Sequence, residues 1–232
     1  MLPPERHRII VARLAESESV RTTELAAALE VTDETIRKDL EALEKRGELL
    51  RVHGGAVRVN QARVEIGLTE RQQANREAKT AIARLAAQRI QANDTIFIDA
   101  SSTALTLVEF LPEVPLTVLT NAHNVVSALA DREGIDLIST GGIWEARSRS
   151  YIGLPAESTM RKHHIHRMFF SCNGLHLERG VSEINARQAA FKERVIQCSE
   201  EVCLLADSSK IGLKASFFFA QIDDLTTLVT NA

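Results

Sequence analysis

Apolar residues in the first part of the chain recur with the spacing of short helices. Residues 5–18 carry an apolar stripe centred on Ile10 and Leu14. The alanine-rich segment TELAAALE predicts a second helix, which Thr22 or Thr23 can cap. A turn then leads into a third periodic segment.

The third segment, DETIRKDLEALEKRG, keeps Ile36, Leu40 and Leu43 on one helix face. Thr32 is placed to cap this helix, and Gly47 is expected to end it. The stretch LLRVHGGAVRV that follows predicts two strands joined by a Gly-Gly turn. Two helices joined by a tight turn and followed by a hairpin indicate a winged helix-turn-helix.

The outward face of the third helix has the chemistry of a DNA-reading surface. Arg37 and Lys38 lie opposite the apolar stripe, near the helix end that contacts base edges in a major groove. The alternative is an ordinary solvated helix face. However, the surrounding residues are acidic, so the positive charge is confined to this helix and the wing, and this confinement favours DNA binding. We expect DNA contacts from Thr32, Thr35, Arg37, Lys38, and from Arg51, His53 and Arg58 in the wing.

Composition narrows the class of protein. The 232 residues carry a net charge of −3, which by itself does not point to a bulk polyanion as partner. No apolar run approaches the roughly 20 residues that span a bilayer, and MLPPERHR lacks a signal-peptide core. Cys172, Cys198 and Cys203 form no C-x-x-C pair, so we expect reduced, buried thiols in a cytoplasmic protein without membrane contact.

The rest of the chain alternates apolar runs with helical patterns. A helix is expected from about residue 75 to 91, and strands at TIFID, LTVLT, DLIST, MFFSC, VCLLA and LTTLVT. Such apolar strands spaced by helices predict an α/β fold with a mostly parallel sheet covered on both faces. We therefore expect a winged helix-turn-helix domain over 1–59, a linker over 60–74 and an α/β sensor domain over 75–232.

Small or polar residues follow five of these strands. The endings are Asp99 to Thr103, Thr120-Asn121, Thr140 to Gly142, Ser171 to Gly174, and Asp207 to Lys210. The carboxyl ends of parallel strands share one edge of a sheet, where ligands bind. Hydroxyl and amide groups suit a polyol, and Lys192 or Lys210 would neutralise a phosphate. Each ending alone is equally consistent with a turn or helix cap, but together they predict a phosphosugar crevice.

The run VTDETIRKDLEALEKRGELLRVHGGAV resembles the N-terminal signature of the DeoR family of bacterial transcriptional regulators. The resemblance covers nearly the whole chain. It implies a sensor domain with a fold like that of ribose-5-phosphate isomerase, and a regulator, normally a repressor, of a sugar-catabolic operon. The expected partners are double-stranded operator DNA and a phosphorylated sugar effector. Because one winged helix reads few base pairs, we also expect a homo-oligomer, a dimer or tetramer.

The strand endings and the resemblance together predict a set of effector contacts. These are Asp99, Ser101, Ser102, Thr103, Asn121, Gly141, Gly142, Ser150, Asn173, Gly174, Asn185, Lys192, Asp207, Ser209 and Lys210. Many relatives carry carboxylates where this chain has Asn173 and Ala186, and isomerisation needs a carboxylate base. We therefore expect no catalytic residues. The alternative is an isomerase-like enzyme fused to a winged helix.

Three further features remain. The motif His163-His164-x-His166 could bind a metal, but no carboxylate or cysteine stands at useful spacing, so a surface or structural role is favoured and no metal or cofactor is expected. Phe217 to Phe219 are expected in the core or a subunit interface rather than on a partner surface. Relatives usually continue through a helix and a strand beyond LTTLVTNA, so the sequence belongs to a short member or to a longer chain.

Overall fold

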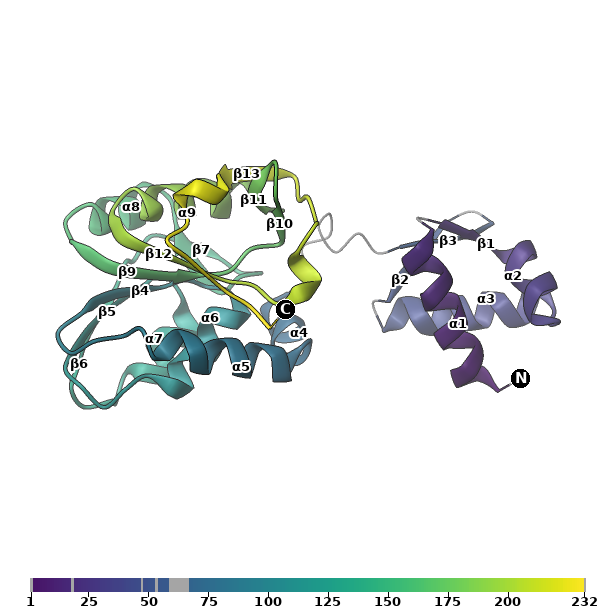
Figure 1. Cartoon of the computed structure of the whole chain (residues 1–232), viewed down its shortest axis with the longest axis horizontal. Helices are drawn as coiled ribbons and strands as arrows, with labels where there is room; N and C mark the ends of the chain where they lie inside the picture. Colours follow the sequence, from purple (N-terminus) through teal and green to yellow (C-terminus); the bar gives the residue numbers. More distant parts are fainter. Residues whose placement is uncertain (1, 18, 47, 53, 59–66, 232) are drawn as a thin grey trace. The chain divides into compact units, whose positions relative to one another are not determined.

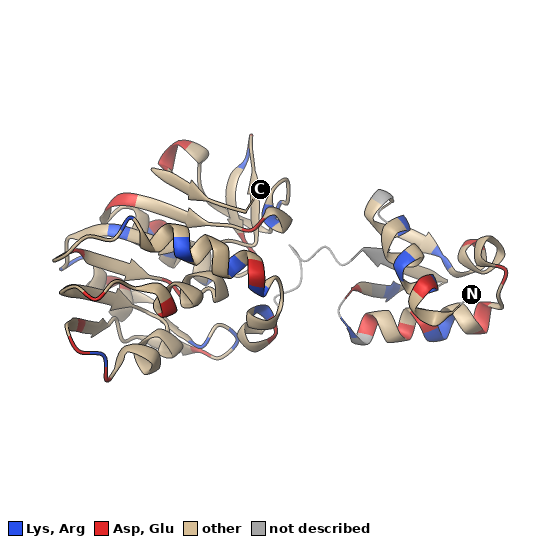
Figure 2. Ribbon diagram, turned by 60° about the horizontal axis from the view of Figure 1, so that its bottom comes forward, with Lys and Arg blue, Asp and Glu red and all other residues tan. Residues whose placement is uncertain are grey.

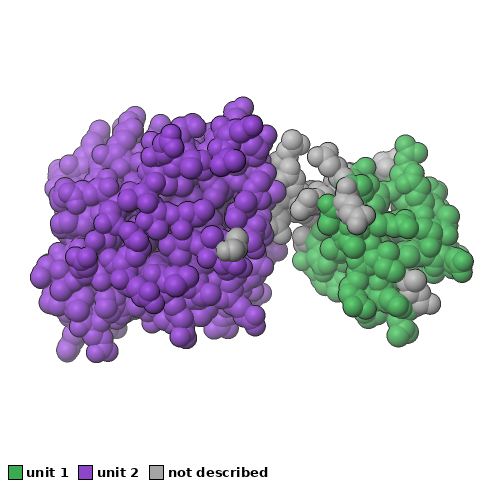
Figure 3. All heavy atoms as spheres, viewed as in Figure 1, with its two compact units in different colours: residues 1–60 green, residues 61–232 purple. Residues whose placement is uncertain are grey.

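The chain forms two compact units whose boundary in the sequence lies near residue 60, and each unit has its own buried apolar core. The computed structural model describes residues 2–17, 19–46, 48–52, 54–58 and 67–231. Two units result, residues 1–60 and residues 61–232 (Figure 3). Among the described residues, the helices are all too short or too polar to span a membrane.

The first unit is a winged helix-turn-helix. Its elements are α1 (Pro3–Glu16), β1 (Ser19–Arg21), α2 (Thr22–Leu29), α3 (Asp33–Lys45), β2 (Leu49–Val52) and β3 (Gly55–Arg58). The strands form an antiparallel sheet in the order β1-β3-β2. Gly54 turns the hairpin with a φ of 81°, and a Cβ at Gly55 would lie 2.1 Å from the carbonyl oxygen of Val20. The two glycines therefore serve the turn and the close approach of β1 to β3.

The caps of the two inner helices differ from one another. The predicted cap of α3 is confirmed, because the Thr32 hydroxyl accepts the Thr35 N–H. The predicted cap of α2 at Thr22 or Thr23 is wrong, because the N-cap position is Arg21 at the end of β1. The buried Thr22 instead donates its N–H to the carbonyl of Gly54 at 2.9 Å. The hairpin turn thus accepts one N–H at the start of α2, which has no side-chain cap at its N-cap residue.

A buried ion pair joins α1 to α3. Arg6 binds Asp39 through two hydrogen bonds of 2.7 and 3.0 Å, and His7 Nε2 lies 3.0 Å from the same carboxylate. The predicted apolar stripe packs beside it, with Ile36, Leu40 and Leu43 fully buried. The orientation of α3 is therefore set by both apolar packing and one paired carboxylate.

The second unit is built on a six-stranded parallel sheet (Figure 1). The strand order is β14-β12-β9-β4-β5-β6, and all five pairings are parallel. The strands are β4 (Thr95–Ile98), β5 (Leu116–Thr120), β6 (Ile135–Ser139), β9 (Ile165–Phe170), β12 (Ser199–Leu205) and β14 (Thr227–Val229). Ile96 and Ile98 belong to one apolar cluster and Phe97 to the other. The predicted α/β class with a covered parallel sheet is confirmed.

Different layers cover the two faces of this sheet (Figure 1). One face packs against α5 (Arg76–Ala87), α6 (Ser102–Leu107), η1 (Val108–Phe110) and α7 (His123–Leu129). The other packs against α8 (Leu154–Met160), α9 (Ala186–Ile196) and a small antiparallel sheet of β10 (Gly174–His176), β11 (Gly180–Glu183) and β13 (Phe217–Ala220). The remaining elements are the hairpin of β7 (Ile143–Glu145) and β8 (Ser150–Ile152), and the turns η2 (Ser208–Lys210) and η3 (Ile222–Asp224).

The second unit departs from expectation at its start. Residues 68–73 of the expected linker form helix α4 (Leu68–Gln73), and Leu68 is buried. The next helix, α5, ends at Ala87 rather than near residue 91. Leu85 is half exposed, because the stripe that packs on the sheet runs through Ile82, Ala83 and Ala86.

Two smaller expectations are met only in part. The three cysteines are unpaired, but Cys198 is half-buried rather than buried. In β13, Phe219 is buried whereas Phe217 remains exposed. Phe218 between them is half-buried, so burial increases along β13 towards Ala220.

Candidate functional site

The outward face of α3 carries the predicted DNA-reading residues. Arg37 and Lys38 are exposed, and Arg37 has only a weak contact to Glu34, at 3.6 Å between exposed side chains. The hydroxyls of Thr32 and Thr35 lie 2.9 Å apart at the start of the helix. Basic and acidic segments alternate along the helices of this unit (Figure 2), so the free positive charge is local rather than a broad patch.

Arg51 in the wing is bound to Glu44 in α3. The backbone N–H of Arg51 donates to Glu44 Oε1 at 2.9 Å, and its guanidinium lies 3.9 Å from Oε2 while staying half exposed. Arg58 lies in β3, but its side chain is outside the described part of the structure, as is the whole of His53. Arg51 is thus the described wing cation that a phosphate could reach.

The predicted strand endings lie on one edge of the six-stranded sheet. In spatial order they follow β12, β9, β4, β5 and β6, as Asp207, Ser171, Asp99, Asn121 and Thr140. All five strands run in the same direction, so their carboxyl ends meet at this edge. We call this edge the carboxyl edge.

Asp99 and Ser101 shape the loop that follows β4. Asp99 Oδ1 accepts hydrogen bonds from the N–H and the hydroxyl of Ser101, at 3.0 and 2.5 Å. The Ser101 hydroxyl also caps α6 by accepting the N–H of Ala104. Both side chains are therefore used within the loop. The buried hydroxyls of Ser102 and Thr103 make no side-chain hydrogen bond to another described residue, so they are not used within the loop.

Asn121, after β5, carries an unused acceptor. Its Nδ2 donates to the carbonyl oxygen of Tyr151 at 3.1 Å, which fixes the orientation of the amide. Its Oδ1 is buried and has no hydrogen-bond partner among the described residues. Such an acceptor carries a free-energy penalty unless a donor reaches it.

The glycines and serine beyond β6 have structural partners. Gly141 and Gly142 have φ of 60° and 123°, and a Cβ at Gly142 would lie 2.7 Å from the carbonyl of Ile152. Ser150 is fully buried and accepts from Gln188 Nε2 at 2.9 Å. The Ser150 contact holds the β7–β8 hairpin against α9, and the Gly142 contact holds the loop after β6 against β8.

Asn173, Gly174 and Asn185 also hold backbone in place. Asn173 Oδ1 accepts the N–H of Ile184 at 3.1 Å, and Asn185 Oδ1 caps α9. A Cβ at Gly174 would lie 2.6 Å from the carbonyl of Leu213. In this structure the three residues stabilise the loops around β10 and β11.

Lys192 lies buried at the carboxyl edge, between two carboxylates. Its Nζ is 3.1 Å from Asp99 Oδ2, donates to Glu183, and donates to the carbonyl of Ser171 at 2.6 Å. Burial alone would lower the pKa of this ammonium, but the charges of Glu183 and Asp99 outweigh it and raise the pKa above its usual value. With three acceptors for three N–H groups, Lys192 has no donor left for a phosphate.

The other expected phosphate ligand lies after β12. Asp207 Oδ1 caps η2 by accepting the N–H of Ser209, and also accepts Asn75 Nδ2 at 3.2 Å. Lys210 is partly exposed in the same turn. A cavity of about 510 Å³ opens here, lined by Asn75, Arg76, Glu77, Ala78, Asp207, Ser208, Ser209 and Asn231.

Two charged residues at this site were not predicted. Glu183 becomes a partner of Lys192 only through the fold, since β11 and α9 bring them together. Lys79 is buried in α5, and its Nζ donates to the carbonyls of Arg71 and Ala74 at the end of α4. Burial lowers the pKa of Lys79 to about 8. Its position among Ile82, Ala83 and Ala86 on the helical stripe was a signal in the sequence.

Family comparisons cover nearly the whole chain. Residues 6–62 match the DeoR-like helix-turn-helix domain, and residues 74–232 match the DeoR C terminal sensor domain. The uncharacterized HTH-type transcriptional regulator YulB of Bacillus subtilis is 40% identical over 232 residues, covering 100% of this chain and 90% of that protein. The L-fucose operon activator of Haemophilus influenzae is 30% identical, covering 97% and 91%. The transcriptional repressor GlcR of B. subtilis is 29% identical, covering 100% and 89%.

Solved structures show a more distant likeness. Ribose 5-phosphate isomerase A from Methanocaldococcus jannaschii is 14% identical with a TM-score of 0.45, over 60% of this chain and 55% of that one. A likeness at this level supports no functional conclusion. The curated relatives above are named as transcriptional regulators or operon activators, which overturns the alternative of an isomerase fused to a winged helix. The chain is a DNA-binding transcriptional regulator, not an enzyme, and it belongs to the DeoR family.

Proposed function

We propose that the chain represses a sugar-catabolic operon and that a phosphorylated sugar at the carboxyl edge controls its binding to operator DNA. The observation that carries the effector proposal is the buried, unpartnered Oδ1 of Asn121. A sugar hydroxyl is a donor of the right kind for this acceptor. Ser102 and Thr103, on the neighbouring loop after β4, offer hydroxyls that can both donate and accept.

The phosphate is assigned to the turn after β12. Lys192 is enclosed by its own acceptors, so the cations available to a phosphate here are the partly exposed Lys210 in η2 and the exposed Arg76 on the wall of the cavity, of which Lys210 lies in the turn itself. The cavity beside Asp207 and Ser209 has room for a small anion. A hydrogen bond to a charged group contributes about 1.5–3 kcal/mol, or roughly ten- to a hundredfold in affinity.

An effector here must also change DNA binding. Helix α4 is the first described element after residue 58, and its last turn is held by Lys79. The neighbouring Asn75 contacts Asp207 and Ser209 in the proposed phosphate turn. A ligand that displaces these contacts would shift α4 and so couple the crevice to the connection toward the DNA-binding unit.

The experiment begins with a thermal-shift screen of the full chain against matched phosphorylated and free sugars. A ligand at a hundred times its dissociation constant should add about 2.7 kcal/mol of stability. The hit is then titrated against operator-bound protein by fluorescence anisotropy. We expect Lys210→Ala to raise the effector midpoint ten- to a hundredfold and Asn121→Leu to raise it at least tenfold, while operator affinity without effector stays nearly unchanged.

Lys162→Ala is the matched control, because this exposed lysine precedes β9 at the opposite edge of the sheet. It should leave the midpoint as in wild type. Equal affinity for free and phosphorylated sugar, with no effect of Lys210→Ala, would remove the phosphate from the proposal. The direction of the anisotropy change distinguishes release from the operator, as for an induced repressor, from tighter binding.

The DNA-bound form is proposed to be a dimer or tetramer. One winged helix exposes few base-reading side chains on α3, whereas operator-level specificity needs two tethered half-sites. Regulators of this kind act where the chromosome is, so we place the protein in the cytoplasm. Sedimentation of a monomer that still binds its operator tightly would contradict the oligomer.

A further inference from the structure

Two histidines and a glutamate meet at the amino edge of the sheet, opposite the effector crevice. His164 immediately precedes β9, His166 is its second residue, and Glu200 is the second residue of β12. Ser199 pairs with Ile165 and Glu201 with Arg167. This register places Glu200 beside His166, and the two-residue period of strands brings His164 to the same face.

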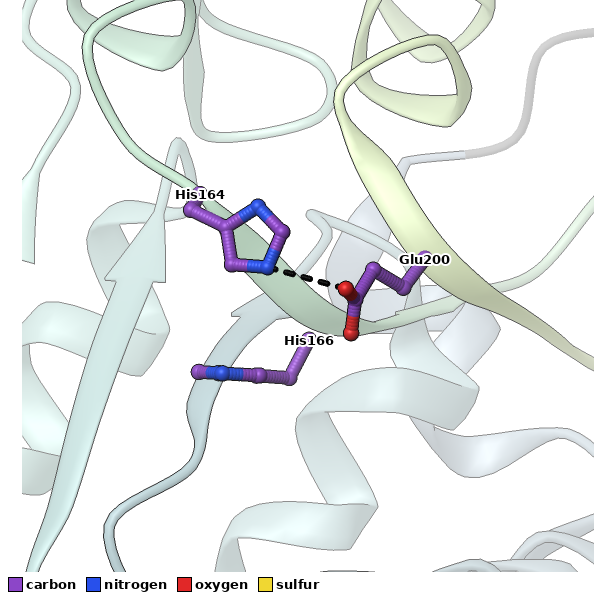
Figure 4. Close-up of side chains that lie close together, drawn as sticks. All are labelled: His164, His166 and Glu200. Atoms are coloured by element: carbon purple, nitrogen blue, oxygen red, sulfur yellow. Dashed lines mark ion pairs between the residues drawn. The ribbon is translucent and has the colours of Figure 1, made fainter.

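The three side chains already converge without a metal. His164 Nε2 lies 3.1 Å from Glu200 Oε1, and His166 lies beside them with its ring 5.1 Å from that of His164 (Figure 4). The possible ligand atoms of all three residues lie within 4.8 Å of one another. Zinc bonds of about 2.0–2.1 Å need tetrahedral ligands about 3.4 Å apart, so the most widely separated donors must close by at most about 1.4 Å. The side chains of His164 and Glu200 are 64% and 58% exposed and are free to make this adjustment.

We propose that His164, His166 and Glu200 form a binding site for a divalent transition-metal ion such as Zn²⁺. Two imidazoles and one carboxylate are a ligand set that suits zinc, copper and nickel better than magnesium or calcium. Three protein ligands leave a fourth position for water. The carboxylate partner that the sequence around His163 to His166 lacks is supplied by Glu200 from the neighbouring strand.

One hydrogen bond in the metal-free protein competes with metal binding by His166. The backbone N–H of Thr95 donates to His166 Nδ1 at 2.9 Å, so in the metal-free protein the neutral ring carries its proton on Nε2. Coordination by His166 exchanges this hydrogen bond for a metal bond. The loss of one such bond lowers the affinity by about tenfold at most. The exchange also provides a direct reporter, the amide of Thr95.

The test uses the untagged full chain and isothermal titration with Zn²⁺. We expect one ion per chain, no comparable binding of Mg²⁺, and an affinity loss of more than about a hundredfold in His164→Ala and Glu200→Gln, since even a residue that only orients a ligand contributes 10–100-fold. His163→Ala is the matched control. It belongs to the same His-rich run, but its ring bonds the carbonyl of Thr159 instead, so it should keep wild-type affinity.

Two further readouts keep the test independent of folding. His164 and Glu200 form an exposed pair that contributes little stability, so both variants should unfold at the wild-type temperature without metal. In the wild type, Zn²⁺ should shift the Thr95 amide resonance and raise the unfolding temperature. Wild-type affinity in His164→Ala and Glu200→Gln, equal losses in His163→Ala, or an unmoved Thr95 amide at saturation would overturn the site.

Discussion

Replacing Lys192 by methionine should strongly destabilise the sensor unit, because two buried carboxylates would lose the cation that they share. The side chains of Lys192, Asp99 and Glu183 are 6%, 2% and 11% exposed. Methionine keeps most of the length of the lysine stem, so the change removes charge and hydrogen bonds with little change in packing. Removing one partner of a buried ion pair costs about 3–5 kcal/mol, and we expect a loss in this range.

The assay is urea unfolding followed by tryptophan fluorescence. Trp144 is the only tryptophan of the chain and lies in β7, so its signal reports on the sensor unit alone. With a slope of about 2 kcal/mol per molar urea, a loss of 3–5 kcal/mol lowers the midpoint by about 1.5–2.5 M. The exposed Lys162→Met is the control and should leave the midpoint unchanged.

A second variant separates charge from shape. Adding Glu183→Gln and Asp99→Asn to Lys192→Met removes the uncompensated carboxylates, so we expect most of the lost stability to return. A midpoint shift below about 0.5 M in the single variant, or no recovery in the triple variant, would refute the view that Lys192 acts as a buried counter-ion.

Three other outcomes are expected. Arg37→Ala should weaken binding to the cognate operator by about 1–3 kcal/mol more than it weakens binding to random DNA. Arg51→Ala should weaken binding to both DNAs alike and reduce the salt dependence of the affinity. Gel-shift titrations at several salt concentrations distinguish a base contact from a phosphate contact. Lys79, with its pKa lowered from 10.5 to about 8, binds a proton more weakly in the folded than in the unfolded chain. Wild type should therefore gain stability relative to Lys79→Met as the pH rises from about 8 to 10.5, and a pH-independent difference in urea midpoints would contradict this. Sedimentation velocity should show an even-numbered oligomer that binds the operator.

The strands of the central sheet were predictable because both of their faces are covered. Runs such as TIFID and LTVLT are apolar throughout, and this pattern distinguishes them from helices and loops. The short strands β1, β7, β8, β10 and β11 carry no such run. They form because other backbone lies beside them, as at Gly55, and nothing local in the sequence records that neighbour.

The sequence predicted which polar residues meet at the carboxyl edge, but not which hydrogen bonds each of them makes there. Parallel strands bring their ends together, so the grouping of Asp99, Asn121 and Asp207 follows from topology. Whether a polar side chain serves the loop or a ligand depends on hydrogen bonds that form only in the fold. Ser101 caps a helix while Ser102 does not, although the two are adjacent.

The hydrogen bonds from Lys79 to the last turn of α4 also determine where a separately expressed sensor unit should begin. A recombinant fragment that begins at Asn75, close to the start of the family match at residue 74, would remove the carbonyls of both Arg71 and Ala74. It would leave a buried amine without these acceptors and delete the buried Leu68. A fragment that begins at Gly67 keeps all three, and is the one expected to fold and to report effector binding faithfully.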